Sequence, residues 1–157
     1  MKHGMNQHMT MHYKHLAIMA GLSFAAMYVL MYAMVDQFAN VFNHYNQVYM
    51  AGLMAAPMVI IELFIMRAMY VNARLNGLIY GAAVVLAVFC WVGIRQQVGV
   101  DDSQLLRAMI PHHAGAVLMC EKATLSNEEV RDLCQKIIES QRQEIAQMKA
   151  KLAEPAL

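Results

Sequence analysis

The stretch Leu16–Val35, LAIMAGLSFAAMYVLMYAMV, runs for 20 residues without a charged side chain. A helix needs about 20 apolar residues to cross the hydrocarbon core of a bilayer, so this stretch predicts a transmembrane helix. Two further apolar runs follow, Val48–Tyr70 and Leu78–Ile94. The last run is closed by Trp91 and Arg95, a pairing typical of a membrane interface. We therefore expect three membrane-spanning helices.

The composition of the whole chain agrees with a membrane protein. Of its 157 residues 59% are hydrophobic and only 15% are charged, and the mean hydropathy is +0.38. Soluble domains of this length seldom carry so few charges. The formal net charge is +1, and no Lys/Arg cluster is present, which argues against nucleic acid as a partner.

Charge density rises sharply at Arg95, and this change divides the chain. We expect a Met/His-rich tail over residues 1–15, a three-span module over residues 16–96, and a helical hairpin over residues 101–157. Asp101 offers an N-cap for the first hairpin helix, and Ser126 opens a capping box for the second. The predicted fold is all-α: three transmembrane helices followed by an antiparallel two-helix hairpin.

The basic residues of the short loops predict the orientation. Lys2 and Lys14 precede the first span, and Arg67 and Arg74 flank the second loop, whereas the first loop, residues 36–47, has no Lys or Arg. Positive residues favour the cytoplasmic side. We expect a bacterial inner (plasma) membrane protein with a cytoplasmic N-terminus and a periplasmic or extracellular hairpin.

The segment of residues 107–119, RAMIPHHAGAVLM, carries the strongest chemical signal. His113 falls within the apolar stripe of its helix and His112 on the adjoining face, and Pro111 should kink the helix beside them. We expect His113 to face the bundle, level with Gln141, and His112 to face a cleft. Imidazole and thioether groups such as that of Met119 favour Cu(I), Ag(I) or Cu(II). Alternatively, His113 and Gln141 only satisfy each other by a hydrogen bond inside a helical interface.

These residues also carry a resemblance. The pattern Met109-Ile-x-His-His, with a Met six residues further on and then Ile137-Ile-x-x-Gln-x-x-Glu-Ile-x-x-Met148, resembles the ferritin-like family known as domain of unknown function 305. The resemblance implies a helical bundle, here a ferritin-like half-bundle, and an extracytoplasmic copper-binding role described for some relatives. It implies these candidate ligands and supporting groups: Met109, His112, His113, Met119, Met148, Gln141 and Glu144.

The N-terminal tail is a second candidate for a soft metal. A flexible tail could wrap a metal ion loosely, or the composition could be accidental in a disordered tail. The candidate ligands include His3, Met5, His8, Met9, Met11 and His12.

Methionines also recur every four residues within two spans. The spacing allows a thioether ladder that passes Cu(I), but Met is an ordinary packing residue and the packing interpretation is the stronger one. The two series are His15, Met19, Ser23, Met27, Met31 and Met50, Met54, Met58, Glu62, Met66. A carboxylate inside a membrane is costly, so Glu62 should face protein, bonded to a tyrosine such as Tyr28 or Tyr32.

Cys120 and Cys134 should come almost level across the hairpin if the chain folds back near Asn127. Outside the cytoplasm the two thiols could form a disulfide.

Enzyme motifs are not found. The sequence has no GxSxG, no Gly-rich phosphate loop, no HExxH, and no ExxH pair for a di-iron centre. We expect a membrane-anchored protein that sequesters or hands on copper or silver outside the cytoplasm. The alternative is a structural, oligomeric assembly protein without metal chemistry. In both cases the apolar stripe Val130–Leu152 favours a homo-oligomer, since one facing helix covers only part of it.

Overall fold

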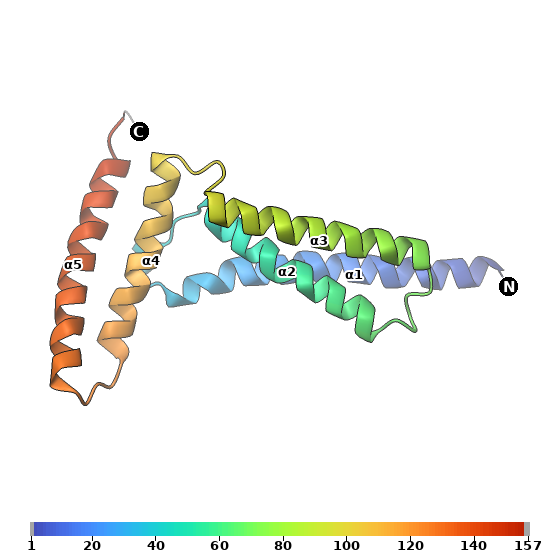
Figure 1. Ribbon diagram of the computed structural model, residues 1–157, viewed down its shortest axis with the longest axis horizontal. Coiled ribbons are helices and arrows are strands. Elements are labelled where there is room, and N and C mark those ends of the chain that lie inside the picture. The colour runs from blue at the N-terminus through green and yellow to red at the C-terminus, as the bar shows by residue number, and fades with distance from the viewer. Residues whose placement is uncertain (1, 156–157) are drawn as a thin grey trace. The chain divides into compact units, whose positions relative to one another are not determined.

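The computed structural model describes the backbone of residues 2–155 and the side chains of residues 11–155. The described residues form five α-helices and two short 3-10 helices (Figure 1). In chain order these are α1 (Lys2–Leu30), η1 (Met31–Met34), η2 (Phe38–Asn40), α2 (Tyr45–Ile65), α3 (Ala73–Gln96), α4 (Asp102–Lys122) and α5 (Glu128–Leu152).

Three helical segments are long and apolar enough to cross a membrane: Met11–Met34, Tyr45–Ile65 and Ala73–Gln96. The all-α prediction with three such helices and a C-terminal hairpin is confirmed. The second segment ends at Ile65, earlier than the sequence pattern indicates, because the backbone turns away from the α-helix before the pair Arg67 and Ala68.

The chain forms two compact units. The membrane unit consists of Met1–Leu30 and Val48–Val98, and the hairpin unit consists of Met31–Gln47 and Gly99–Leu157. The sequence pattern assigns residues 31–47 to the three-span module, yet they pack with the hairpin. We call Met31–Gln47 the connector.

The membrane unit is held together at the end where α1 meets the α2–α3 loop. The hydroxyl of Tyr13 donates to Asn76 Oδ1 at 2.7 Å, and Asn76 Nδ2 donates to the carbonyl of Tyr70 at 2.7 Å. Leu16 and Leu63 are buried with Tyr70 beside this polar group. Helix α1 runs unbroken from Lys2, so residues 2–15 continue the first span rather than forming the flexible tail expected from the sequence.

Glu62 has a tyrosine partner, but not an expected one. The hydroxyl of Tyr70 donates to Glu62 Oε1 at 3.4 Å. The expectation named Tyr28 or Tyr32. The difference follows from the end of α2 at Ile65, which puts Glu62 in the last turn of its helix and within reach of the α2–α3 loop.

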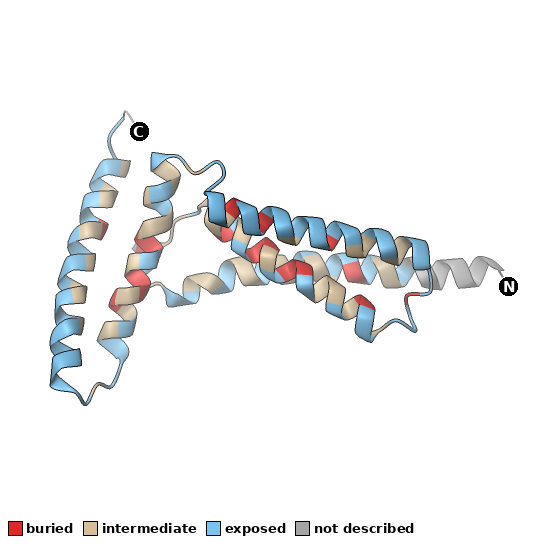
Figure 2. Ribbon diagram, viewed as in Figure 1, coloured by how far each residue is buried: buried red, intermediate tan, exposed pale blue. Residues whose placement is uncertain are grey.

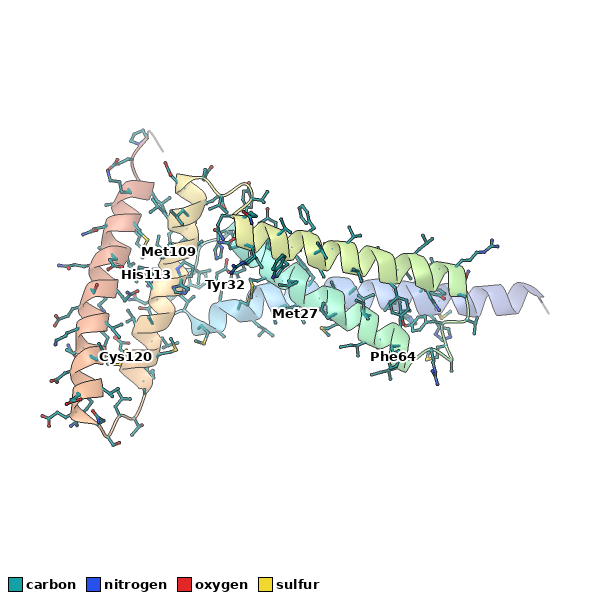
Figure 3. All side chains as sticks on the ribbon, in the orientation of Figure 1. Met27, Tyr32, Phe64, Met109, His113 and Cys120 are labelled. Carbon is teal, nitrogen blue, oxygen red and sulfur yellow. A yellow bond between two sulfur atoms is a disulfide. The ribbon has the colours of Figure 1, made fainter. Side chains whose placement is uncertain are left out.

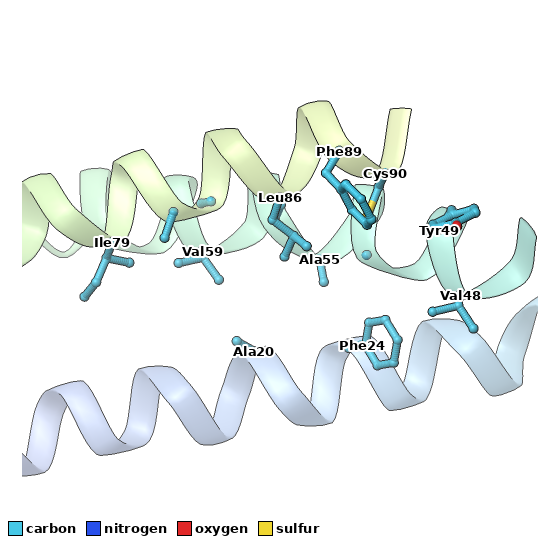
Figure 4. Close-up of a pocket in the computed structure, with 14 residues that line it drawn as sticks. Ala20, Phe24, Val48, Tyr49, Ala55, Val59, Ile79, Leu86, Phe89 and Cys90 are labelled. Carbon is cyan, nitrogen blue, oxygen red and sulfur yellow. The ribbon is translucent and has the colours of Figure 1, made fainter. Parts of the chain in front are cut away.

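An apolar cavity of about 460 Å³ lies between α1 and the pair α2 and α3 (Figure 4). Phe24 of α1, Val59 of α2 and Leu86 of α3 line it. Helices α2 and α3 approach closely at Gly52, where an added Cβ would lie 2.7 Å from the Sγ of Cys90. Helix association through small residues, which is common in membranes, therefore accounts for this part of the unit.

In the hairpin unit, α4 and α5 lie side by side and antiparallel (Figure 1). The side chain of Asp101 accepts from the Gln104 amide at 2.7 Å and caps α4, and that of Asn127 accepts from the Val130 amide at 3.1 Å and caps α5. The second cap lies one residue after the expected Ser126, because α5 begins only at Glu128.

The core of the hairpin unit is small and lies mainly on α4 (Figure 2). Ile110 and Ala114 of α4 are buried with Ile145 of α5. Val35 and Phe42 of the connector pack against this cluster. Two helices with one apolar stripe each make a thin core, and the connector thickens it.

Cys120 and Cys134 form a disulfide near the turn of the hairpin (Figure 3). Their Cα atoms are 5.1 Å apart, within the range that a disulfide requires. The expected proximity of the two cysteines is confirmed.

Candidate metal-binding cleft

Helix α4 presents two different faces. Residues at positions 109, 112, 116 and 119 fall on one face, because spacings of three, four and three residues return to the same side of an α-helix. Residues at positions 110, 113 and 117 fall on the face that packs against α5. Figure 3 labels one residue of each face, Met109 and His113.

The first face lines a cleft of about 430 Å³ within the hairpin unit. Its other wall comes from the connector. The sulfur- and imidazole-bearing residues that line it are Met31, Met34, His44, Met109, His112 and Met119. Asp, Glu, Lys and Arg are absent from the described residues that line the cleft, so its donor groups are neutral thioethers, imidazoles, amides and a hydroxyl.

The connector reaches α4 because residue 115 is glycine. A Cβ added to Gly115 would lie 3.3 Å from the carbonyl oxygen of Met34. This distance is shorter than nearly all Cβ contacts, so a larger residue would push the connector away. Gly115 is buried.

Hydrogen bonds fix the connector's path. The hydroxyl of Tyr32 donates to the Phe42 carbonyl at 2.8 Å, and Asn40 Nδ2 donates to Asp36 Oδ1 at 2.6 Å. At the far end the amide of Tyr45 donates to Gln104 Oε1 of α4, at 3.1 Å. The connector is therefore an ordered part of the hairpin unit.

His44 lines the cleft but also closes the start of α2. The backbone amide of Gln47 donates to His44 Nδ1 at 3.2 Å. Burial lowers the pKa of His44, and a side-chain hydrogen bond with Gln47 offsets part of this lowering. The ring is accordingly favoured in its neutral form. Its Nδ1 accepts a bond, so its proton is on Nε2.

His113 lies on the opposite face, against α5. Its Nδ1 is 3.1 Å from Glu144 Oε2, close enough for an ion pair but outside hydrogen-bond geometry, so this buried nitrogen has no hydrogen-bond partner. Burial lowers the pKa of His113, the charge of Glu144 opposes that effect, and His112 adds to it. The expected facing of His113 toward the bundle and of His112 toward a cleft is confirmed.

The residue opposite His113 is Glu144 rather than the expected Gln141. Side chains of a helix lean toward its N-terminus. In an antiparallel hairpin, the side chain of His113 therefore leans away from the turn, and the side chains of α5 lean toward the turn. A residue one turn beyond the level position, Glu144, consequently meets the imidazole.

The remaining sequence candidates do not share the cleft. Met148 packs against the core of Ile110, Ala114 and Ile145. In the N-terminal part of α1, the Met11 side chain is half exposed and His12 lies edge-on to the ring of Tyr70, with centroids 6.5 Å apart. The side chains of His3, Met5, His8 and Met9 lie outside the described residues.

Harder metal sites are not apparent in the part of the chain that the structure describes. No three side chains of His, Cys, Asp or Glu gather there in a way that could hold a metal ion. Zinc and di-iron centres depend on such groups. The cleft differs because its donors are mostly thioethers.

Sequence reasoning missed three lining residues: it assigned Met31 to a ladder within the first span and did not single out Met34 or His44. A usable signal was present, since Met31 and Met34 are three residues apart at the end of an apolar run.

Comparison with known proteins gives two findings. Residues 94–152 match the family described as Domain of unknown function (DUF305). An uncharacterised protein of Acanthamoeba polyphaga mimivirus is 29% identical over 143 residues, which cover 89% of this chain and 92% of that protein. This alignment is longer than the matched domain and so extends into the membrane unit. No solved structure matches. The matched residues 94–152 include both helices of the hairpin, α4 and α5, and this part of the chain is similar to the domain of unknown function 305 family.

Proposed function

We propose that this chain is a membrane-anchored protein that binds a soft metal ion, copper or silver, outside the cytoplasm and stores it or hands it on. The observation that supports this most is the shared cleft of Met109, His112 and Met119. Thioether and imidazole donors suit Cu(I), Ag(I) and, less well, Cu(II), and they attract Mg²⁺ or Ca²⁺ poorly.

The cleft has room for an ion at its surface. His112 and Met119 are exposed, while Met109 is half-buried. An exposed imidazole can release its metal ion without unfolding of the hairpin. This suits storage and transfer of an ion better than permanent structural binding.

Two observations support an extracytoplasmic hairpin. Disulfides such as Cys120–Cys134 persist in oxidising compartments and are rare in the cytosol. At the other end, the bond between Tyr13 and Asn76 brings the start of the first span beside the α2–α3 loop. The basic residues Lys14 and Arg74 lie within two residues of this pair in sequence, as the positive-inside rule expects of a cytoplasmic end.

Anaerobic Cu(I) titration of the full chain in detergent micelles, against a chromophoric Cu(I) chelator, tests the proposal. His112→Ala and Met109→Leu should each weaken binding by at least about 10-fold, since even the loss of an outer-shell partner costs that much. Met→Leu nearly conserves volume, so lost affinity reports ligation rather than packing.

Met148→Leu is the matched control, because Met148 packs in the core and does not line the cleft. It should keep the parent affinity. The tail is identical in all variants, so differences report on the cleft. If His112→Ala and Met109→Leu keep the parent affinity for Cu(I), the metal role of the cleft is wrong and the assembly function takes its place.

A further inference from the structure

We propose that the connector completes the metal site: the thioethers of Met31 and Met34 bind the same soft ion as Met109, His112 and Met119. The site then forms only when the hairpin is joined to the ends of its membrane helices, and it prefers a monovalent ion. This inference rests on the proposed function and adds ligands from outside residues 94–152.

The local conformation of the connector brings its two thioethers together. Met31 and Met34 are the first and last residues of η1, a 3-10 helix. A 3-10 helix has three residues per turn, so side chains three apart lie one above the other. An α-helical continuation of α1 would instead have turned Met34 about 60° away from Met31. Both side chains line the cleft.

The connector is held where these thioethers can share an ion with α4. Gly115 allows the Met34 carbonyl to approach α4, and Val35, the next residue, packs on the core of Ile110 and Ala114. Phe42 packs on the same core from the other end of the connector. The placement of Met31 and Met34 is therefore part of the packing of the hairpin unit and not a chance approach of a loop.

The donor set favours a charge of +1. Thioethers carry no charge, an imidazole binds a metal ion through an unprotonated nitrogen, and no carboxylate or thiolate lines the cleft within the described residues. An ion that is bound by these donors has no opposite charge beside it in the cleft, and the cost of removing an ion from water without such compensation rises with its charge. Soft neutral donors therefore bind Cu(I) or Ag(I) in this cleft in preference to Cu(II) or Zn²⁺.

His44 has a different role from the methionines. Its Nδ1 accepts the bond from the Gln47 amide, which leaves Nε2 protonated and unable to bind a metal ion in this tautomer. We assign His44 as the residue that caps the start of α2. The ligands from the connector are its two thioethers.

Methionine footprinting of the full chain in micelles tests the proposal at single residues. Peroxide converts an accessible thioether to the sulfoxide, and a silver ion bound to that sulfur blocks the reaction. With Ag(I) at about ten times the dissociation constant, mass action leaves roughly a tenth of the site empty. The oxidation rates of Met31, Met34, Met109 and Met119 should then fall together by about 10-fold.

Met69 is the internal control, because it is exposed, at 37%, and lies outside both the cleft and the three spans. Its rate should not change. Protection of Met109 and Met119 without Met31 and Met34 overturns the role of the connector and leaves the proposed function standing. Protection of none of the four removes both. Equal protection of Met69 shows silver binding without a specific site and also overturns the proposal.

Affinity measurements supply the second test. The double variant Met31→Leu/Met34→Leu should weaken Cu(I) and Ag(I) binding by at least about 10-fold. The matched control, Met50→Leu/Met54→Leu, changes two exposed methionines of α2 outside the cleft and should have the parent affinity. An unchanged affinity of the first variant refutes the shared site even if His112→Ala weakens binding.

Discussion

Each of the two faces of α4 carries one histidine, and the two histidines have different surroundings. His113 faces α5, is 12% exposed and lies beside Glu144. His112, the next residue back, is exposed and lines a cleft with thioethers. Adjacent residues of an α-helix point about 100° apart, so a His-His pair cannot act as one unit on a regular helix. The comparison teaches that one imidazole serves the fold and leaves the other available for a ligand.

The faces also differ in what closes them. The His113 face is covered by α5, which follows α4 directly and is tied to it by the Cys120–Cys134 disulfide. The His112 face is bordered by the connector, about 70 residues earlier in the chain. The closed face is therefore covered mainly by the next helix in sequence, which is covalently secured, with Val35 and Phe42 of the connector packing beside it. The wall opposite the open face comes from the connector.

The largest expected effect is on the closed face. Replacing Cys120 and Cys134 by Ala removes a cross-link between residues 14 apart in sequence. A loop of this length contributes about 3 kcal/mol to the free energy of unfolding. Amide hydrogen exchange reports the free energy of local opening. Exchange of the α4 and α5 amides in the full chain should therefore become faster by an amount that corresponds to this loss.

In the presence of a reductant, the parent chain should have the exchange rates of the double variant. The rates of the double variant itself should not change. Cys90, the buried free thiol of α3, is present in both and serves as the background. If exchange in α4 and α5 is unaffected by reduction, the closed face does not depend on its disulfide.

The two histidines should differ in their effect on stability. His113→Ala removes a mostly buried ring and its contact with Glu144, and we expect a loss of about 1–2 kcal/mol in unfolding free energy. His112→Ala changes an exposed side chain and should stay within about 0.5 kcal/mol. The same amide exchange measurement compares them.

If His112→Ala destabilised α4 as much as His113→Ala, the assignment of only His113 to the stability of the fold would be wrong. A Glu144→Gln variant sharpens it. Glutamine keeps the size of the side chain but removes its charge, so a loss smaller than that of His113→Ala shows that ring packing outweighs the contact with the Glu144 carboxylate.

Much of the closed face could be predicted from sequence. The apolar periodicity of α4 and α5 places His113 inward, and folding back near Asn127 brings Cys120 level with Cys134. These features depend on helical geometry and on a short turn alone. The predicted partner of His113, Gln141, was wrong. The prediction paired residues at equal distances from the turn and neglected that side chains of a helix lean toward its N-terminus, which favours Glu144.

The open face was only half predictable. Its α4 residues, Met109, His112 and Met119, follow from the 3.6-residue period and from the family resemblance. The contribution of Met31 and Met34 did not follow, because an apolar run such as Leu16–Val35 indicates a continuous helix whose end it does not mark. The change to a 3-10 helix after Leu30 has no signal in hydropathy, and the segment that adopts it approaches α4 at Gly115.

The smallest expected effect comes from a variant that moves the connector but keeps its metal-binding side chains. Gly115→Ala adds one methyl group 3.3 Å from the Met34 carbonyl oxygen and removes no ligand. Alanine stabilises a helix by about 1 kcal/mol relative to glycine, and displacement of the connector by a few tenths of an ångström offsets that gain. We therefore expect little net change in stability but a loss of Ag(I) affinity of about 3-fold, smaller than the roughly 10-fold for a lost donor. Gly81→Ala on α3 is the matched control, because nothing lies within 4 Å of its added Cβ. A Gly115→Ala variant that binds Ag(I) as tightly as the Gly81→Ala variant shows that the site tolerates a shifted connector, and metal binding on the open face of α4 then does not depend on the exact position of residues 31–47.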